Sequence, residues 1–295
     1  MQPEYILQFF ISGVTNGSIY ALIAIGFSIT FSATKLINFA QCEFGMLGGF
    51  IAVTLLRQLG LPLIVALPFS ICIVAALGGI LERVTLRPFR RATHLQLVTI
   101  TLGTGVLLKA IAVIVWGKDA TFLPAFSGET PFEVAGATIT PQALWIIGAA
   151  CVAVLLLALF YARTAWGKAT QAAAMNPSAA HLVGIPVETI ATVAFAVAAG
   201  MGALAGVLIA PVTAVHFNVG TFMGLKGFAA ASLGGMGSFP GAIIGGLVLG
   251  LLESFGAGLL SSGYKNAIAL GVVILVLMAR PAGIIGSIVG NVEEA

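Results

Sequence analysis

Three polar side chains lie close together in an otherwise apolar stretch of this chain. Asn38, Gln41 and Glu43 precede a run of glycines and large apolar residues that ends near residue 56. A carboxylate and two amides can hold a small polar solute, yet a carboxylate inside a bilayer costs about 2.5–3.5 kcal/mol. That cost indicates binding or gating. The alternative is structural: Asn38 caps a helix whose first turn contains Glu43. Both interpretations hold if the helix begins at membrane depth.

A second polar stretch, residues 220–239, contains Lys226 and many glycines, and Pro240 follows it. This composition disfavours a smooth helix and predicts a broken segment. At membrane depth, non-helical backbone is tolerated only against protein or a water-filled cavity. Discontinuous segments of this kind are typical of transport pathways. A surface loop followed by a short helix is the alternative.

Further polar residues lie in the first apolar run and near the end of the chain. Asn16 and Tyr20 are one helical turn apart and share a face. Lys109 is expected to reach the membrane surface or to pair with an acid. Glu253 is a second buried acid for which the sequence indicates no partner. The candidate pathway residues are therefore Asn16, Tyr20, Asn38, Gln41, Glu43 and Lys226.

Signals for catalysis or for a metal or cofactor site are not found. His94, His181 and His216 are far apart in sequence. The number of cysteines, three, is odd, and all three lie in apolar stretches, so a disulfide framework is not expected. The closest approach to a phosphate-binding loop, residues 258–265, lacks the Gly-Lys-Ser/Thr ending. We expect no enzyme activity and no nucleic-acid partner. If transport needs ATP, another chain must hydrolyse it.

The composition places these residues in a membrane. Apolar residues make up 59% of the 295 positions and charged residues 8%, against about 45–50% and 25% in soluble domains. Several apolar runs reach the roughly 20 residues that a helix needs to span a bilayer. The runs do not alternate in polarity as the strands of a membrane β-barrel do. The sequence predicts an all-α polytopic integral membrane protein whose residues 1–295 form one transmembrane domain in contact with lipid.

About eight transmembrane helices are predicted, plus the broken or re-entrant segment at 220–239. The expected spans are residues 6–33, 39–56, 61–81, 95–116, 144–161, 189–212, 242–260 and 266–278. Glycine pairs spaced four apart indicate close helix packing. These pairs are Gly13 and Gly17, Gly202 and Gly206, Gly241 and Gly245, and Gly246 and Gly250.

Basic residues predict the orientation, because Lys and Arg accumulate on the cytoplasmic side. The connections around residues 83–91 and 163–168 are basic, whereas the segment between residues 117 and 143 carries one Lys and three acids. The N-terminus is therefore expected outside. Arg280 lies inside if the 220–239 segment crosses as a ninth passage, which we favour over a re-entrant loop.

The internal loop at residues 163–188 is predicted to contain two short helices. Residues 168–175 are rich in alanine, Asn176 and Pro177 break this helix, and Pro177 can start a second helix that reaches His181 and ends at Gly184. Two such helices with small side chains fit a groove of a partner. A packed cytoplasmic hairpin without a partner is the alternative.

Several of these stretches, in this order, make the chain resemble the LivH-type permeases of branched-chain amino acid ABC importers. The similar residues are 16–26, 37–41 with Glu43, 176–185, 226–241 and 280–283. The resemblance implies a bacterial inner-membrane permease that assembles with a second, LivM-like permease, two cytoplasmic ATPases and a periplasmic binding protein. It also implies that the 163–188 loop couples to an ATPase. The residues expected to do so are Lys168, Gln171, Asn176, Pro177, His181 and Gly184.

Two positions differ from the usual family pattern. Gln171 stands where the family usually has Arg, and Gln41-Cys42 stands where a His-Gly pair is common. Related members carry urea, amides or aromatic acids, so the substrate is expected to be a branched-chain amino acid or a related small polar solute. The alternative function is a self-sufficient, ion-coupled secondary transporter or a channel.

Overall fold

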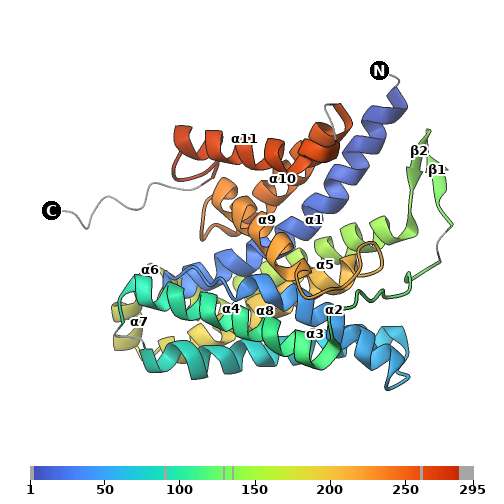
Figure 1. Cartoon of the computed structure of the whole chain (residues 1–295). Helices are drawn as coiled ribbons and strands as arrows, with labels where there is room; N and C mark the ends of the chain where they lie inside the picture. The colour runs from blue at the N-terminus through green and yellow to red at the C-terminus, as the bar shows by residue number, and fades with distance from the viewer. Residues whose placement is uncertain (1–2, 90–91, 129, 135, 260–261, 286–295) are drawn as a thin grey trace.

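The computed structural model describes residues 3–89, 92–128, 130–134, 136–259 and 262–285. Helices dominate these residues, and one small antiparallel hairpin accompanies them (Figure 1). The longer helices are α1 (Pro3–Thr34), α2 (Gln41–Arg57), α3 (Leu63–Leu81), α4 (His94–Trp116), α5 (Pro141–Arg163), α8 (Val187–Ile209), α9 (Val219–Gly234), α10 (Phe239–Leu259) and α11 (Lys265–Ala279). The shorter elements are η1 (Glu82–Leu86), η2 (Arg87–Phe89), β1 (Phe132–Val134), β2 (Ala137–Ile139), α6 (Ala165–Met175), α7 (Pro177–Leu182) and η3 (Ser262–Tyr264).

The predicted all-α polytopic fold is confirmed. Within the described residues, six helices are long and apolar enough to cross a membrane: α1, α3 extended through η2, α4, α5, α8 and α10. The spans predicted at 39–56 and 266–278 coincide with α2 and α11, which have 17 and 15 residues. These two helices are shorter than the roughly 20 residues of a full span. The large apolar side chains on the outer faces of α3, α4 and α5 are exposed, as lipid-facing residues are, and include Ile64, Ile114 and Leu156.

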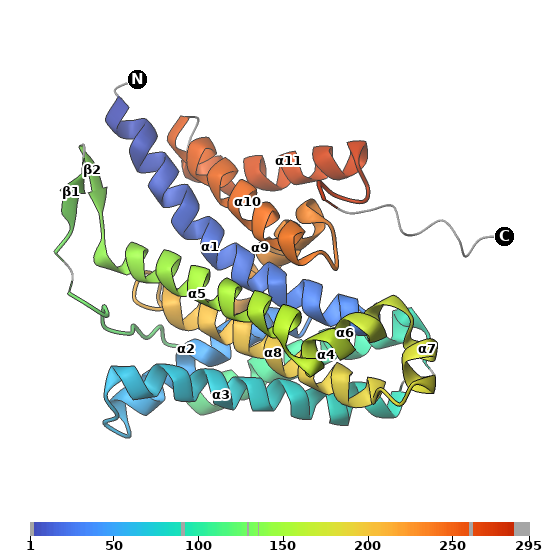
Figure 2. The same ribbon diagram turned by 180° about the vertical axis from the view of Figure 1, so that it is seen from behind.

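The bundle has two distinct ends. The β1–β2 hairpin lies at the end where α1 begins, and α6 and α7 lie at the opposite end (Figures 1 and 2). The basic connection between α3 and α4 ends at the same side as α6 and α7. The two basic segments thus share one end of the bundle, in the arrangement that loop charge predicts for a cytoplasmic face.

Glycines bring α1 and α10 into close contact. A Cβ atom at Gly17 would lie 2.9 Å from the Cα atom of Leu247, and one at Gly250 would overlap the backbone of Gly13 and Gly17. The same device joins α8 to α2, where a Cβ atom at Gly206 would overlap Gly45. Small residues allow helix backbones to approach closely in lipid. The packing predicted from the spaced glycine pairs is confirmed.

The prediction of a break within residues 220–239 is wrong for most of that segment. Residues Val219–Gly234 form one continuous helix, α9, and the interruption is confined to the four residues before α10. There, Gly235 and Gly237 adopt φ angles of 108° and 84°, which glycine adopts without steric cost. Inside α9, glycines serve packing: a Cβ atom at Gly227 would lie 2.6 Å from Ile23 Cβ. These tertiary contacts outweigh the low helix propensity of glycine.

The residues that flank helix α9 contact elements near opposite ends of the bundle. Just before it, Val215 pairs with Thr121 of the segment that leads to the β-hairpin. Just after it, the Gly237 carbonyl accepts a hydrogen bond from Ser32 near the C-terminus of α1, at 2.9 Å. Its 16 residues span about 24 Å at 1.5 Å per residue. This course favours a crossing over a loop that returns to its starting side.

Candidate functional site

A buried group of ionisable side chains joins α1, α9 and α10. Lys226 Nζ lies 2.8 Å from Glu253 Oε1, and the Tyr20 hydroxyl donates to Glu253 Oε2 at 2.7 Å. Lys226 also donates to the Tyr20 oxygen at 3.1 Å. Only 4% of the Glu253 side chain is exposed. We call these three residues the Glu253 cluster. It supplies the partner for Glu253 that could not be named from the sequence.

A cavity of about 350 Å³ borders the Glu253 cluster. It lies between the first half of α1 and the last turns of α10, on the side of the β-hairpin, because the lining residue Gln8 accepts a hydrogen bond from Thr138 N of β2 at 2.7 Å. Asn16 and Glu253 both line it. Among its other lining residues are Phe9, Ser12 and Ser254. The structure thus brings three predicted pathway residues together: Tyr20 and Lys226 belong to the cluster, and Asn16 lines the cavity beside it.

A second polar group lies on another side of α9. The Thr221 hydroxyl donates to Glu43 Oε1 at 2.8 Å, and Lys109 donates to Thr221 Oγ1 at 2.6 Å. Lys109 Nζ is 3.8 Å from Glu43 Oε1. These residues come from α2, α4 and α9, and we call them the Glu43 cluster. Lys109 therefore pairs with an acid, which was one of its two predicted roles.

Helix α9 connects the two clusters. Thr221 and Lys226 are five residues apart, which places them about 140° apart around a helix with 3.6 residues per turn. One side of α9 thus contacts α2 and α4, and another contacts α1 and α10. Isolated charges inside a membrane protein are costly and are generally paired. The positions of both clusters identify α9 as the element around which the polar groups of the bundle are arranged.

Gln41 and Asn38 lie apart from the Glu253 cluster. The Gln41 side chain donates from Nε2 to the Ala198 carbonyl at 2.8 Å and so joins α2 to α8. Asn38 Oδ1 accepts from Ala40 N at 3.1 Å in a turn that precedes α2. The residue before the first turn of α2 is Ala40, so the interpretation of Asn38 as the helix cap is wrong. Glu43 does lie in the first turn of α2.

Three of the residues in the two clusters were missed as pathway candidates. Each of them contacts a predicted pathway residue: Glu253 contacts Tyr20, and both Lys109 and Thr221 contact Glu43. The sequence did contain a signal that Glu253 and Lys226 pair. Each is a single charged residue of opposite sign in an apolar segment, and a buried charge requires a partner. Thr221 has no such signal, because threonines in membrane helices mostly bond to their own backbone.

The predicted pair of short helices is present in the 163–188 loop. Asn176 caps α7, accepting from Ala179 N at 2.9 Å, and Gly184 follows α7 with a φ angle of 83°. The tip of this hairpin exposes three apolar side chains: Met175 (88%), Leu182 (88%) and Val183 (75%). All six predicted coupling residues are exposed as well: Lys168, Gln171, Asn176, Pro177, His181 and Gly184.

The inner face of this hairpin packs against the bundle. Ala173 of α6 and Ala180 of α7 are buried with Ile190 of α8 in one apolar cluster. On another side of α6, a cavity of about 550 Å³ is lined by Gln171, by Gly237 and by Phe239 at the start of α10. The hairpin is therefore in contact with α8 and close to the junction between α9 and α10.

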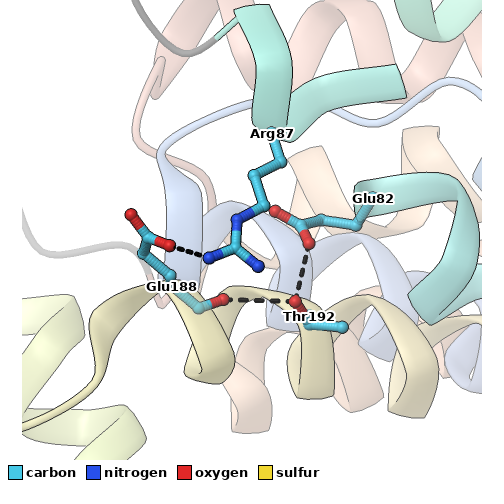
Figure 3. A network of polar contacts seen from close by, with 4 residues as sticks. All are labelled: Glu82, Arg87, Glu188 and Thr192. Carbon is cyan, nitrogen blue, oxygen red and sulfur yellow. Dashed lines mark hydrogen bonds and ion pairs between the residues drawn. The ribbon is translucent and has the colours of Figure 1, made fainter. Parts of the chain in front are cut away.

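A network of polar contacts joins α8 to the connection between α3 and α4 (Figure 3). Arg87 forms an ion pair with Glu188 in the first turn of α8. One turn later, the Thr192 hydroxyl donates to Glu82 Oε2 at 2.7 Å. Glu82 is buried at the start of η1. Because α8 follows α7 after four residues, this network anchors the base of the α6–α7 hairpin to α3.

The described residues contain no group of three or more His, Cys, Asp or Glu side chains that could hold a metal ion. The polar groups of the bundle are hydrogen-bonding and ion-pairing groups, which suits the binding and passage of a polar solute.

Comparison with known proteins identifies the family. Residues 9–278 match the family model described as the permease component of the branched-chain amino acid transport system. The chain belongs to this family. The permease protein BraD of Pseudomonas aeruginosa, named for high-affinity branched-chain amino acid transport, is 36% identical over 96% of this chain and 97% of its own. LivH of Escherichia coli, with the same description, is 36% identical over 96% of both chains.

A more distant relative is the probable branched-chain amino acid permease LivH of Methanocaldococcus jannaschii, which is 28% identical over 92% of this chain and 90% of its own. No solved structure matches this chain. Membership of the family makes the chain a permease component of an importer, located as a multi-pass protein in the bacterial inner membrane. The resemblance predicted from sequence is confirmed, and the self-sufficient transporter is not supported.

Proposed function

We propose that this permease translocates branched-chain amino acids, or closely related small polar solutes, as the membrane-spanning subunit of an ATP-driven importer. The observation that carries the substrate class is the 36% identity, over 96% of the chain, to two permeases named for branched-chain amino acid transport. The placement of charged side chains around α9, inside an apolar bundle, supports the proposal because such charges are costly and commonly mark substrate pathways in membrane proteins.

The proposed partners are a second, related permease of LivM type, two cytoplasmic ATPases and a periplasmic binding protein. ATP hydrolysis is assigned to the ATPases, because residues 258–265 of this chain lack the Gly-Lys-Ser/Thr ending of a phosphate-binding loop. The exposed tip of the α6–α7 hairpin supports an ATPase contact, because Met175, Leu182 and Val183 present apolar surface at the basic end of the bundle. Exposed apolar patches of this kind mark protein–protein contacts.

The proposed pathway residues are Asn16, Tyr20, Lys226 and Glu253 around one side of α9, and Glu43 with its neighbours Asn38 and Gln41 at the start of α2. Closure of the ATPases would displace the α6–α7 hairpin, since Lys168, Gln171, Asn176, Pro177, His181 and Gly184 form its surface. The hairpin would then move α8, against which it packs, and the junction between α9 and α10. The expected result is a change between outward- and inward-facing arrangements.

Reconstitution in proteoliposomes tests this function. The complete importer should accumulate leucine, isoleucine or valine only when ATP and binding protein are both supplied. Competition with urea, amides and aromatic acids then ranks the substrate classes. Accumulation by this chain alone, driven by an ion gradient and without ATP, would overturn the proposal.

A further inference from the structure

We propose that the Glu253 cluster and its neighbouring cavity form a binding site for a zwitterionic α-amino acid in transit. In this site, the Glu253 carboxylate binds the substrate ammonium, and the Asn16 amide and Ser12 hydroxyl bind the substrate carboxylate. The inference rests on the proposed function and deepens it, because it names the residues that recognise the two charges of the substrate.

The acidic half of the site is formed by Glu253. Glu253 is one of the residues that line the cavity, and its carboxylate accepts hydrogen bonds from Tyr20 at 2.7 Å and Lys226 at 2.8 Å. A carboxylate has about four acceptor positions, so an ammonium that arrives from the cavity can bind Glu253 by sharing the carboxylate with its existing partners or by exchanging with one of them. Lys226 and Tyr20 then act as positioning residues, because they fix the direction in which the carboxylate points.

The hydrogen-bonding half of the site lies on α1. Gln8, Ser12, Asn16 and Tyr20 follow one another at intervals of four residues, a spacing that aligns side chains on one helix face. The first three line the cavity, and the fourth reaches Glu253. These three residues border the cavity beside α10, and they also line a cavity of about 170 Å³ on the side of α5. Amide and hydroxyl groups of this kind can donate to a carboxylate without introducing a fixed positive charge that would hold it too tightly.

The size and the apolar wall of the cavity suit a small aliphatic amino acid. A volume of about 350 Å³ is near the lower end of the 300–1,000 Å³ typical of small-molecule sites. Phe9 and Ala257 form apolar wall beside these polar residues of α1. A solute without an ammonium would make no charge-assisted hydrogen bond with Glu253. The arrangement therefore favours zwitterions over urea or simple amides.

A purely structural role for the ion pair is the competing explanation, and the physics of buried charges separates the two. A buried pair is often no more stabilising than apolar residues of similar volume, whereas removal of one partner is strongly destabilising. Two paired changes therefore preserve the fold: the neutral pair Lys226→Met with Glu253→Leu, and the exchanged pair Lys226→Glu with Glu253→Lys. If the charges only stabilise the bundle, both pairs should transport normally.

The experiment compares uptake of labelled leucine by the complete importer in proteoliposomes, with co-purification of the ATPases and basal ATP hydrolysis as measures of assembly. Both paired variants should assemble and lose uptake by about tenfold or more, as expected when a charge-assisted hydrogen bond to the substrate is lost. Ser12→Ala and Asn16→Leu leave the ion pair in place and should also reduce uptake. Thr15→Ala is the matched control, since the Thr15 hydroxyl bonds to Ile11 O of its own helix at 2.8 Å.

Uptake at the wild-type rate by either assembled paired variant, or by both Ser12→Ala and Asn16→Leu, would overturn the site while leaving the proposed function in place. If the paired variants do not assemble, the outcome for Ser12→Ala and Asn16→Leu decides alone. If the wild-type importer moves no amino acid in the presence of ATP and binding protein, the proposed function fails, and the zwitterion site fails with it.

Discussion

Lys226 Nζ on α9 lies 2.8 Å from Glu253 Oε1 on α10, and the helices around this ion pair are mostly apolar. Neither residue would be stable there alone, because an unpaired charge inside a membrane protein is costly. The pair therefore makes the positions of α9 and α10 depend on each other, and Tyr20 extends that dependence to α1.

The first prediction concerns the loss of one member of this pair. Glu253→Gln leaves Lys226 with no compensating charge, and we expect the free energy of unfolding to fall by about 3 kcal/mol or more. Thermal unfolding of the purified protein in detergent measures the change. The neutral pair Lys226→Met with Glu253→Leu should recover most of the loss. Equal unfolding temperatures for Glu253→Gln and the wild type would contradict this account of the pair.

The second prediction concerns the Glu43 cluster. Glu43→Gln removes the negative charge near Lys109 Nζ, which lies 3.8 Å away, and weakens the contact between α2 and α9 through Thr221. We expect ATP-driven uptake to fall severalfold, and Asn38→Ala to reduce it as well. Glu133→Gln, in the exposed β-hairpin, serves as the control. Unchanged uptake and assembly in both variants would remove Glu43 and Asn38 from the pathway.

The third prediction concerns the α6–α7 hairpin. Leu182→Asp places a charge on one of its most exposed apolar side chains and should reduce co-purification of the ATPases by about tenfold, since hot-spot side chains at interfaces contribute 1–2 kcal/mol or more. Folding should be unaffected, because Leu182 is 88% exposed. Phe132→Asp, at the opposite end of the bundle, should leave co-purification unchanged. Full ATPase binding by Leu182→Asp would exclude this tip as the contact.

The fourth prediction concerns the contact between α1 and α10. At Gly17 a Cβ atom would lie 2.9 Å from Leu247 Cα, so Gly17→Val must separate the two helices and should destabilise the protein by about 1–3 kcal/mol. Gly148→Val in α5 is the matched control, because no atom lies within 4 Å of its added Cβ. Thermal unfolding of both variants in one detergent decides whether close approach, rather than loss of glycine itself, causes the effect.

The fifth prediction concerns the orientation. In a variant without native cysteines, a cysteine at position 182 should react with a membrane-impermeant maleimide only after the cells are opened, because the basic loops at that end predict a cytoplasmic face. A cysteine at position 133 should react in intact cells. Labelling of position 182 from outside would reverse the orientation and remove the proposed ATPase contact.

The sequence predicted the helices well where its signals were local. Asn176 and Pro177 placed the boundary between α6 and α7 because a cap and a proline act on their immediate neighbours. The prediction failed at residues 220–239, where the glycines of α9 fit against Ile23 and Cys42. Those contacts join residues about 180–200 positions apart in the chain, and no local pattern reports them.

The site was predicted in part for the same reason. Single charges in apolar runs identified Glu43 and Lys226, because their cost does not depend on which residue pairs with them. The pairing itself is a tertiary property. Tyr20 and Glu253 are brought together by the glycine contact between α1 and α10. The sequence alone does not specify which faces of these two helices contact each other.

Thr221 and Lys226 hold α9 from two directions, toward α2 and toward α10. A helix that is bonded on two sides resists rotation about its own axis, because a rotation that shortens one contact lengthens the other. While both contacts hold, α9 can tilt as a rigid helix, and a larger movement requires these contacts to break. A substrate that weakens the Lys226 contact would remove one of the two restraints, and the rotation of α9 that this permits would change the distance between Thr221 and Glu43 on the other side of the helix.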